Sequence, residues 1–434
     1  MNTPTPEPTP GSGSSAVNND PSTSPEAATQ SDAKKRTKLT GSSRTAILGA
    51  MFLMATSSIG PGFITQTSVF TVQLGVAFAF AILVSLLVDI AIQLNVWRVL
   101  GVTGLRANEL GNRVLPGIGW VMAAFVFVGG LIFNIGNIGG AGLGINAMLG
   151  VDARIGGAVS ALIAIVVFVF KSAGAALDRI VVALGAIMIL LMLYVAIVSE
   201  PPIGAALKNS VFPEQVDFLV ITTLIGGTVG GYITFAGAHR LIDSKITGAE
   251  NVGHITGVSV MSVIVTGIMR VLLFLAILGV VAGGVALSND NTAADAFRAA
   301  AGEIGLRFFG VVLWAAGLTS VIGASYTSIS FVTTQKTSTR VRSLLTVGFI
   351  LVCAIAYLVL NKAPQTLLIF AGAFNGLILP IGFAVVMWVA WARRDLLHGY
   401  AYPKWLAVVG TLTWLLTIWL GWKSLTGIAA LWQG

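Results

Sequence analysis

Two stretches of this chain carry residue types that could bind a small solute, and both lie inside long apolar segments. The first runs from Ser57 to Thr67 around Gly60-Pro61-Gly62, and the second runs from Gly226 to Tyr232. Glycine and proline interrupt the hydrogen-bond ladder of a helix, which hydrocarbon tolerates only where the freed N–H and C=O groups line a protected cavity. Two interruptions in corresponding positions of two halves of a chain are typical of a transporter's substrate site.

The freed backbone groups define the chemistry that these stretches offer. N–H groups at positive helix ends suit an anionic group such as a carboxylate, and carbonyl groups suit an ammonium or a monovalent cation. Phe63 and Tyr232 would pack on an organic body. Thr65 and Gln66 would either contact the solute or only satisfy freed backbone groups, and Gly60-Pro61-Gly62 taken alone could be a simple kink. The candidate substrate-binding residues are Gly60, Pro61, Gly62, Phe63, Thr65, Gln66, Thr228, Gly230, Gly231 and Tyr232.

Five further polar residues inside apolar segments are candidates for a permeation path or for coupling. Asn134 and Asn137, three apart on one helix face, would line a path or hydrogen-bond neighbouring helices. Asp89 and Arg270 are functional suspects because ionisable residues are expensive in a membrane span. The alternatives for them are a buried structural pair, or an Arg270 that reaches toward an interface. Asn375 is another potential lining residue.

The composition excludes an ordinary soluble domain. The 434 residues are 56% hydrophobic and 10% charged, with a mean hydropathy of +0.89, whereas soluble domains carry about 25% charged residues. The basic residues behind the net charge of +8 fall in short loops, so membrane topology explains them better than nucleic-acid binding. Cys353 and three scattered histidines form no metal motif, and no cofactor is expected. No nucleophile with a base and no paired carboxylates appear at working spacing, so an enzyme is not expected.

Long apolar helices must position these residues, and we count eleven apolar stretches of sufficient length to cross a bilayer. They lie near residues 45–72, 76–97, 117–146, 155–171, 179–198, 217–238, 252–283, 307–332, 343–360, 365–391 and 405–429. Residues 1–43, rich in Pro, Ser and Thr, predict a disordered cytoplasmic tail before a transmembrane domain over 44–432. Residues 290–305 and 104–112 predict short amphipathic helices.

The positions of the two interruptions predict an inverted repeat. The sixth span begins five spans after the first, and an odd number of spans turns the second unit upside down relative to the first. We expect the first repeat over 45–198, the second over 217–391 and an extra helix over 405–429. The excess of Lys and Arg in alternate loops predicts a cytoplasmic amino terminus and an external carboxyl terminus in the cytoplasmic membrane.

At these residues the chain resembles the NRAMP (natural resistance-associated macrophage protein) family of metal-ion transporters. That family carries Asp-Pro-Gly-Asn in a broken first span and Val-Thr-Gly further on, where this chain has Gly60-Pro61-Gly62-Phe63 and, at matching spacing, Val102-Thr103-Gly104. The family's sixth span reads Gly-(small)-Thr-Val-Met-Pro-His, and here residues 226–232 read Gly-Gly-Thr-Val-Gly-Gly-Tyr. Residues 315–326 are similar to the family's eighth span. The resemblance covers nearly everything after the tail. It implies an all-α polytopic membrane protein of the leucine-transporter type, with two inverted five-helix repeats and broken helices 1 and 6.

The chain departs from that family at the positions that handle metal and protons. The resemblance implies that the family's Asp, Asn and Met ligate a transition metal, and those positions hold Gly60, Phe63 and Gly230. The family's histidine becomes Tyr232, and the two asparagines of the third span replace an Asp and a Glu implicated in proton passage. A dehydrated divalent metal at mid-membrane needs anionic or soft ligands, because an unpaired buried charge is costly. No metal site is therefore predicted.

The sequence thus predicts a secondary transporter that moves a small neutral or zwitterionic organic solute, such as an amino acid, by alternating access. One alternative is a transporter of a divalent cation, Mg²⁺ or Mn²⁺, as the resemblance alone implies. A second is a membrane receptor that kept the fold and transports nothing. The expected partners are a small-molecule or ion substrate and the lipid bilayer, with no nucleic acid, and we expect a monomer. The coupling ion stays open.

Overall fold

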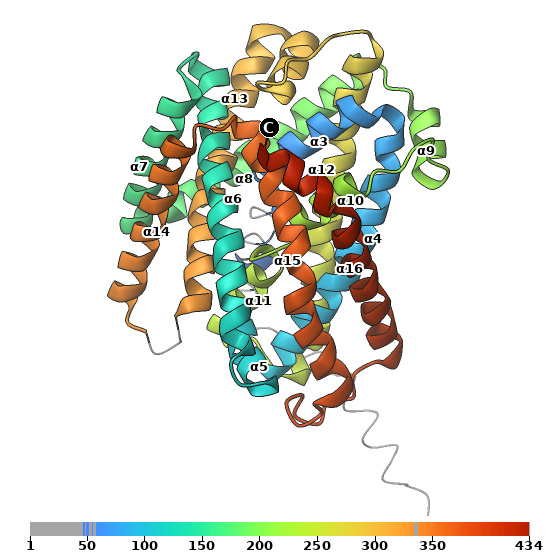
Figure 1. Ribbon diagram of the computed structural model, residues 1–434. Coiled ribbons are helices and arrows are strands. Elements are labelled where there is room, and N and C mark those ends of the chain that lie inside the picture. Colours follow the sequence, from blue (N-terminus) through green and yellow to red (C-terminus); the bar gives the residue numbers. More distant parts are fainter. Residues whose placement is uncertain (1–46, 48, 52–53, 55–57, 334–336, 434) are drawn as a thin grey trace, which may run out of the picture. The chain divides into compact units, whose positions relative to one another are not determined.

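The computed structural model describes residues 47, 49–51, 54, 58–333 and 337–433, so the tail predicted over 1–43 lies outside the described residues. Every regular element in the described ranges is a helix (Figure 1). The longer helices are α3 (Pro61–Leu74), α4 (Phe78–Thr103), α6 (Ile118–Leu149), α7 (Ala153–Val169), α8 (Lys171–Val198), α10 (Phe218–Thr228), α11 (Ile233–Asp243), α12 (Val252–Ala282), α13 (Thr292–Val332), α14 (Thr339–Leu360), α15 (Pro364–Ala392) and α16 (Lys404–Gln433). The short ones are η1 (Gly75–Ala77), α5 (Ala107–Val114), α9 (Ile203–Val211) and η2 (Ala249–Asn251).

The described helices confirm a multi-pass membrane protein. Eight of them are long and apolar enough to cross a membrane, or nine if the bent pair Leu184–Val198 and Ile203–Val211 forms one span. This count takes Pro61–Thr103 as one helix of 43 residues, although it includes the stretch predicted over 76–97 and the end of the one predicted over 45–72. Helix α7, with 17 residues, is slightly too short to be counted as a span. Each stretch predicted from residue 76 onward corresponds to a described helix. The sequence did not predict α9.

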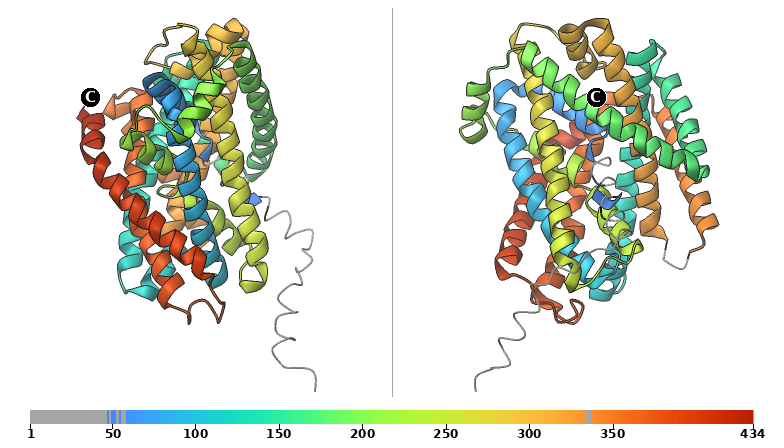
Figure 2. Two further views of the ribbon diagram at one scale, coloured as in Figure 1. Left: turned by 90° about the vertical axis from the view of Figure 1, so that its right-hand side faces the viewer. Right: turned by 180° about the vertical axis from the view of Figure 1, so that it is seen from behind.

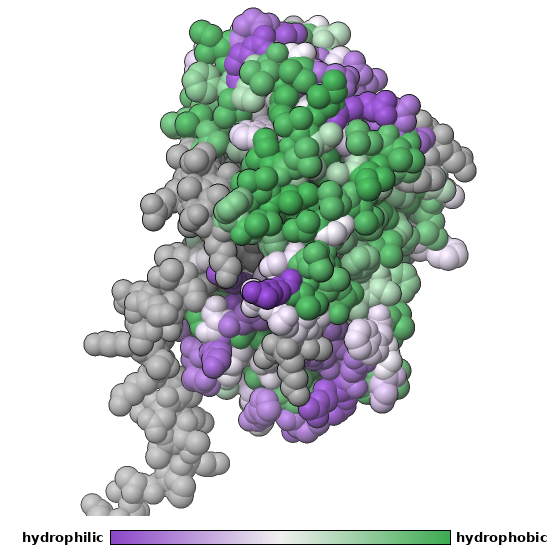
Figure 3. Space-filling view, turned by 90° about the vertical axis from the view of Figure 1, so that its left-hand side faces the viewer, coloured by the Kyte–Doolittle hydropathy of each residue, from purple (hydrophilic) through white to green (hydrophobic). Residues whose placement is uncertain are grey.

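The outer surface carries the apolar belt that a lipid environment requires. In Figure 3 apolar side chains cover the middle of the face, and hydrophilic residues gather toward its top and bottom. Among the outward side chains are Leu162 of α7, 60% exposed, and Val359 of α14, 75% exposed. A soluble monomer rarely exposes a continuous apolar surface of this extent.

Close packing of α6 against α13 builds one wall of the interior. A Cβ atom on Gly144 of α6 would lie 2.3 Å from the backbone nitrogen of Trp314, and one on Gly317 of α13 would lie 2.8 Å from Cα of Ala141. Small residues at these positions let the two backbones approach, which is the main way in which helices associate tightly in lipid. Two asparagines of α6 are thereby held against α13.

The two predicted amphipathic helices are present. Gly302, with φ 64° and ψ −163°, interrupts α13, so its first ten residues form a separate helix that corresponds to the one predicted over 290–305. The other is α5, which begins three residues later than predicted, because Gly104 adopts a left-handed conformation at the end of α4. The first segment of α13 and α9 lie toward one end of the bundle, whereas α5 and the α15–α16 loop lie at the other (Figures 1 and 2).

Candidate functional site

The two helix interruptions lie side by side. Gly60 is the extended N-cap of α3, with φ −86° and ψ −173°, and Pro61 is its first residue, where its missing N–H is harmless. The second interruption is a turn over residues 229–232, between α10 and α11. The hydroxyl of Ser58 donates a hydrogen bond of 3.0 Å to the carbonyl oxygen of Thr228, which is 170 residues away in the chain. The two predicted halves of the candidate site are therefore in direct contact.

The turn between α10 and α11 needs glycine. Gly231 has φ +54°, and a Cβ atom there would lie 1.7 Å from Oδ1 of Asn375 in α15. The Asn375 amide nitrogen donates to the carbonyls of Gly129 and Ala371, at 3.1 and 2.8 Å, so its oxygen is held toward the turn. That oxygen has no partner among the described residues. The N–H of Gly230, which we expected to be free, donates to the carbonyl of Ile225 at 3.1 Å.

Both α6 asparagines are fully buried, Asn137 beside the interruptions and Asn134 between α13 and α14. Asn134 donates through Nδ2 to the Ser325 hydroxyl of α13 at 3.0 Å, but its Oδ1 is unpartnered in the described part of the chain. The Asn137 amide interacts with the Tyr232 hydroxyl and has no other described partner. A Cβ atom on Gly60 would lie 3.6 Å from Oδ1 of Asn137, so this amide stands beside the first interruption.

Some polar side-chain atoms of α3 and α10 form hydrogen bonds with backbone carbonyl groups. Gln66 donates through Nε2 to the carbonyl of Leu368 at 3.1 Å, and its Oε1, which lacks a described partner, stands 2.3 Å from where Gly227 would carry a Cβ atom. The Thr228 hydroxyl donates to the carbonyl of Leu224 within its own helix at 2.9 Å. Thr65 is buried as well. Gln66 is thus the member of this group that keeps a free polar atom.

The two aromatic rings expected to hold an organic body are both buried but lie apart. Tyr232 packs edge-on against Phe133 of α6, with ring centroids 5.7 Å apart. Its hydroxyl meets the Asn137 amide and no other polar group in the described ranges. Phe63 belongs to a different apolar cluster, together with Leu273 of α12. The guanidinium carbon of Arg270 lies 4.6 Å from the centroid of its ring. One ring therefore faces α6 and the other faces α12.

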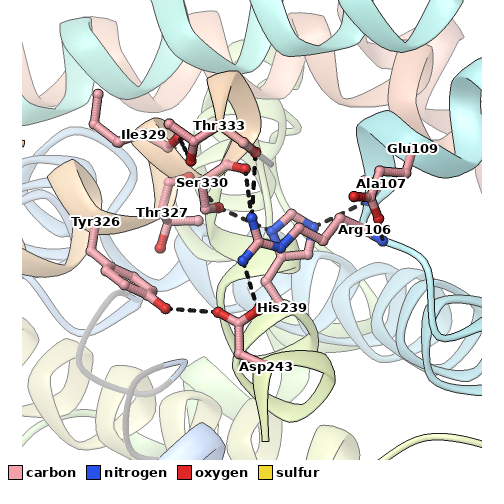
Figure 4. Close-up of polar contacts among 10 residues, drawn as sticks. All are labelled: Arg106, Ala107, Glu109, His239, Asp243, Tyr326, Thr327, Ile329, Ser330 and Thr333. Carbon is pink, nitrogen blue, oxygen red and sulfur yellow. Dashed lines mark hydrogen bonds and ion pairs between the residues drawn. The ribbon is translucent and has the colours of Figure 1, made fainter. Parts of the chain in front are cut away.

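A polar cluster that the sequence did not single out joins the ends of α5, α11 and α13 (Figure 4). Arg106, the N-cap of α5, is 1% exposed and donates through Nη2 to Asp243 at the end of α11, at 2.6 Å. Its Nη1 reaches the carbonyls of Ser330 and Thr333 at 3.3 and 3.4 Å. The Tyr326 hydroxyl donates to the other Asp243 oxygen at 2.9 Å. The sequence indicates only the local part of this cluster, in which Glu109, three residues after Arg106, accepts a hydrogen bond from the Arg106 backbone N–H.

His239 extends this cluster in its neutral form. Its Nε2 accepts from the Ala107 N–H at 3.2 Å, so the ring proton lies on Nδ1, which is 3.1 Å from the Ser330 hydroxyl. That hydroxyl in turn donates to the carbonyl of Thr327. Every polar atom of the imidazole is therefore engaged in structure. The cluster can lock three helix ends together and has no arrangement of a catalytic centre.

The site around the interruptions offers recognition by hydrogen bonds. In the described ranges no group of three or more His, Cys, Asp or Glu residues could hold a metal ion. Two buried charged residues border it, Asp89 and Arg270, which are 1% and 3% exposed, so Arg270 does not reach an interface. They line a small cavity together with Thr228. The remaining groups that converge on the interruptions are amides, hydroxyls and aromatic rings.

A membrane-spanning helical bundle in which two interrupted helices meet is the architecture of inverted-repeat secondary transporters. Residues 51–426 match the family described as Natural resistance-associated macrophage protein-like, and the chain belongs to this Nramp family. It is 46% identical, over 390 residues, to the uncharacterized membrane protein YcsG of Bacillus subtilis (strain 168), covering 89% of this chain and 96% of that protein.

Solved structures show the same fold. The Eremococcus coleocola manganese transporter, in complex with an aromatic bis-isothiourea substituted compound, superimposes with a TM-score of 0.68 at 17% identity, covering 88% of this chain and 86% of that one. MhsT in complex with L-phenylalanine gives a TM-score of 0.62 at 17% identity, covering 86% and 98%. The chain is therefore a polytopic helical protein of the leucine-transporter type, as predicted, and its family is one of secondary transporters.

Proposed function

We propose that this chain is a secondary transporter that carries a small neutral or zwitterionic organic solute, such as an amino acid, by alternating access. The chain would lie in the cytoplasmic membrane as a monomer, with its amino terminus in the cytoplasm and its carboxyl terminus outside. The solute would bind where the two interruptions meet. Gly60 to Phe63, Thr65, Gln66, Thr228, Gly230, Gly231 and Tyr232 would shape its site.

One observation carries this proposal: unpartnered polar atoms on buried, neutral side chains gather at the interruptions. They are Oε1 of Gln66 and Oδ1 of Asn375, together with the Asn137 amide and the Tyr232 hydroxyl, which interact with each other and have no further described partner. More than nine in ten buried polar groups in proteins have a hydrogen-bond partner, and leaving one unmade costs about 1 to 3 kcal/mol. A solute that brings both donors and acceptors would supply these partners.

The electrostatics of the site oppose a divalent metal as the substrate. A metal needs carboxylate, imidazole or thiolate ligands, and the residues at the interruptions offer amides and hydroxyls. The buried charges beside the interruptions are one cation and one anion, Arg270 on the Phe63 ring and Asp89 in the cavity that Thr228 lines. Because these two charges balance, they leave no net negative charge to stabilise Mn²⁺ or Mg²⁺. The solute bound to MhsT, L-phenylalanine, is of the class proposed here.

Uptake by the purified protein in liposomes tests the proposal. We would compare the accumulation of radiolabelled amino acids, presented singly, with that of Mn²⁺. The matched variants are Asn137→Ala, which removes an amide at the site, and Asn209→Ala, which removes a buried amide of α9 that bonds Ala205 and Glu214. We expect saturable uptake of at least one amino acid, lost in Asn137→Ala and kept in Asn209→Ala.

Two outcomes would overturn the proposal. Saturable Mn²⁺ uptake without uptake of any amino acid would show that the chain moves a metal through neutral ligands. Uptake of neither, from protein whose melting temperature shows that it is folded, would favour a receptor on the same fold.

A further inference from the structure

Asp89 of α4 and Arg270 of α12 form a pair of opposite charges inside the membrane that the proposed site does not yet use. Asp89 is 1% exposed and Arg270 is 3% exposed. Charged side chains at this depth are expensive, and proteins retain them where they bind or move something. Arg270 is the charged residue that acts electrostatically on Asp89, and Asp89 is the one that acts on Arg270.

The two residues do not form a direct ion pair. No nitrogen of Arg270 lies within 4.0 Å of a carboxylate oxygen among the described residues, as it would in a salt bridge. Instead they share a cavity of about 10 Å³, room for roughly one water molecule. The lining comes from α4, α10 and α12, and Asp89 and Arg270 are its titratable residues. Helices α3 and α10, which pack against α4 and α12, carry no charged side chain.

The orphaned atoms of Arg270 define a specific binding edge. Its Nε and Nη2 atoms are buried without hydrogen-bond partners in the described part of the chain, and so is Oδ1 of Asp89. Nε and Nη2 carry the two parallel N–H groups through which a guanidinium binds a carboxylate in a bidentate manner. If Arg270 were needed only for structure, its Nε and Nη2 groups would have hydrogen-bond acceptors, because a buried donor without a partner is costly.

The pair also touches both helix interruptions. The guanidinium lies on the ring of Phe63, three residues after Gly60, with 4.6 Å between its carbon and the ring centroid. The cavity is lined by Thr228, whose carbonyl accepts the hydrogen bond from Ser58. Any movement of α3 or α10 during transport would therefore change the surroundings of both charges.

We propose that the Nε and Nη2 edge of Arg270 binds a carboxylate group of the transported solute when movement of α3 or α10 widens this cavity, while Asp89 takes up one proton from the solution. This inference rests on the proposed function and specifies its substrate class and its coupling ion. Without solute, ionised Asp89 balances Arg270. A second carboxylate at the guanidinium would place two anionic groups beside one cation in a medium of low dielectric constant, and protonation of Asp89 removes the repulsion between them. The proton enters with the carboxylate from one side and leaves with it on the other.

Acetate, the smallest carboxylate, probes this site without knowledge of the natural solute, and acetamide is its neutral analogue. We would measure the melting temperature of the purified full chain with each at several concentrations. Binding to the folded state raises that temperature by mass action. For wild type, stabilisation by acetate should grow as the pH is lowered from about 8 toward 6, where acetate is still ionised. Acetamide should have no effect at any pH.

Variants assign the effect to the two residues. Asp89→Asn mimics the protonated acid, so acetate should bind tightly at every pH. Arg270→Gln should weaken acetate binding by about thirtyfold or more, the usual penalty for removing one partner of a buried charge pair. Arg270→Lys keeps the positive charge but lacks the two parallel N–H groups, so its acetate affinity should lie between those of wild type and Arg270→Gln. Arg393→Gln, which removes an arginine from an exposed ion pair with Asp395, is the matched control and should behave as wild type.

The pH series on wild type needs no variant to fold, so the test holds even if a substitution unfolds the chain. Equal stabilisation by acetate at all pH values in wild type, or equal effects of acetate and acetamide, would overturn the inference. Transport of an amino acid by Arg270→Gln at the wild-type rate would overturn it while the proposed function stands. Arg270-dependent acetate binding without transport of any amino acid would support the carboxylate site and refute the proposed function.

Discussion

Replacing Asp243 by asparagine should release the end of α11 from α5 with little change in side-chain volume. In the cluster of Figure 4 the Arg106 guanidinium is 1% exposed and the Asp243 carboxylate is 20% exposed, with 2.6 Å between nitrogen and oxygen. Removing one partner of a buried ion pair costs about 3 to 5 kcal/mol. Arg106 would keep its bonds to the carbonyls of Ser330 and Thr333, and Asp243 is partly solvated, so we expect about 2 kcal/mol.

A double-mutant cycle isolates this interaction. The free energy of unfolding in detergent would be compared for wild type, Asp243→Asn, Arg106→Gln and the double variant. Because each single change leaves the other partner buried and uncompensated, the double variant should be less destabilised than the sum of the singles, by about 1 to 3 kcal/mol. The exposed pair Arg393 and Asp395, 2.8 Å apart, is the control and should show no measurable coupling.

Additive effects at Arg106 and Asp243 would refute the reasoning, because they would mean that the contact contributes nothing beyond two separate side chains. A functional readout comes from labelling a cysteine placed at Ser328, which is buried next to this cluster in α13, after Cys353 has been replaced. Loosening the three helix ends in Asp243→Asn should speed labelling from the α5 end. Unchanged labelling would show that the cluster does not control access.

Three further substitutions probe the interruptions. Tyr232→Phe removes a buried hydroxyl that meets only the Asn137 amide among the described residues, so the melting temperature should change little while solute affinity falls, and an unchanged affinity would place the solute elsewhere. Gly231→Ala should destabilise strongly, because φ is +54° and the new Cβ atom would meet Asn375 at 1.7 Å, whereas Gly348→Ala, with nothing within 4 Å, should not. Gly60→Asp, which would introduce the acidic residue of the family motif, should confer no Mn²⁺ binding by calorimetry. Its Cβ atom would lie 2.5 Å from the Ser320 hydroxyl, and residues 60–63 and 226–232 supply no second acidic, imidazole or sulfur ligand; tight binding would contradict the account of missing ligands.

Much of the fold could be predicted from residue types and their spacing along the sequence. Apolar runs of spanning length predicted the helices, because hydrocarbon admits a backbone only when its own hydrogen bonds are satisfied. Pro61 and the glycines of residues 226–232 marked both interruptions for the same reason. Gly302 was not recognised as the kink that joins the amphipathic helix to α13, because a single glycine in a helical pattern does not reveal its φ angle.

The candidate site could be predicted only in part. The stretch around Gly60 and the one ending at Tyr232 were recognised as related from their types and places in two halves of the chain. Their direct contact through Ser58 and the carbonyl of Thr228 follows from packing that neither segment encodes alone. The same limit applies to Phe63 and Tyr232, which point into separate clusters because the rotation of each helix about its axis is set by its neighbours.

The sequence by itself determined that this chain is a helical membrane protein with two interrupted spans, and it places neutral residues at the positions that the resemblance matches to the family's metal ligands. These properties depend on residue type, hydrophobicity and spacing along the chain. Only the tertiary structure decided which charges meet: that Arg106 bonds Asp243, 137 residues away, and that Arg270 lies on Phe63 with one edge unsatisfied. The physical reason is that a side chain's electrostatic partners are chosen by the packing of distant helices, which no local pattern records.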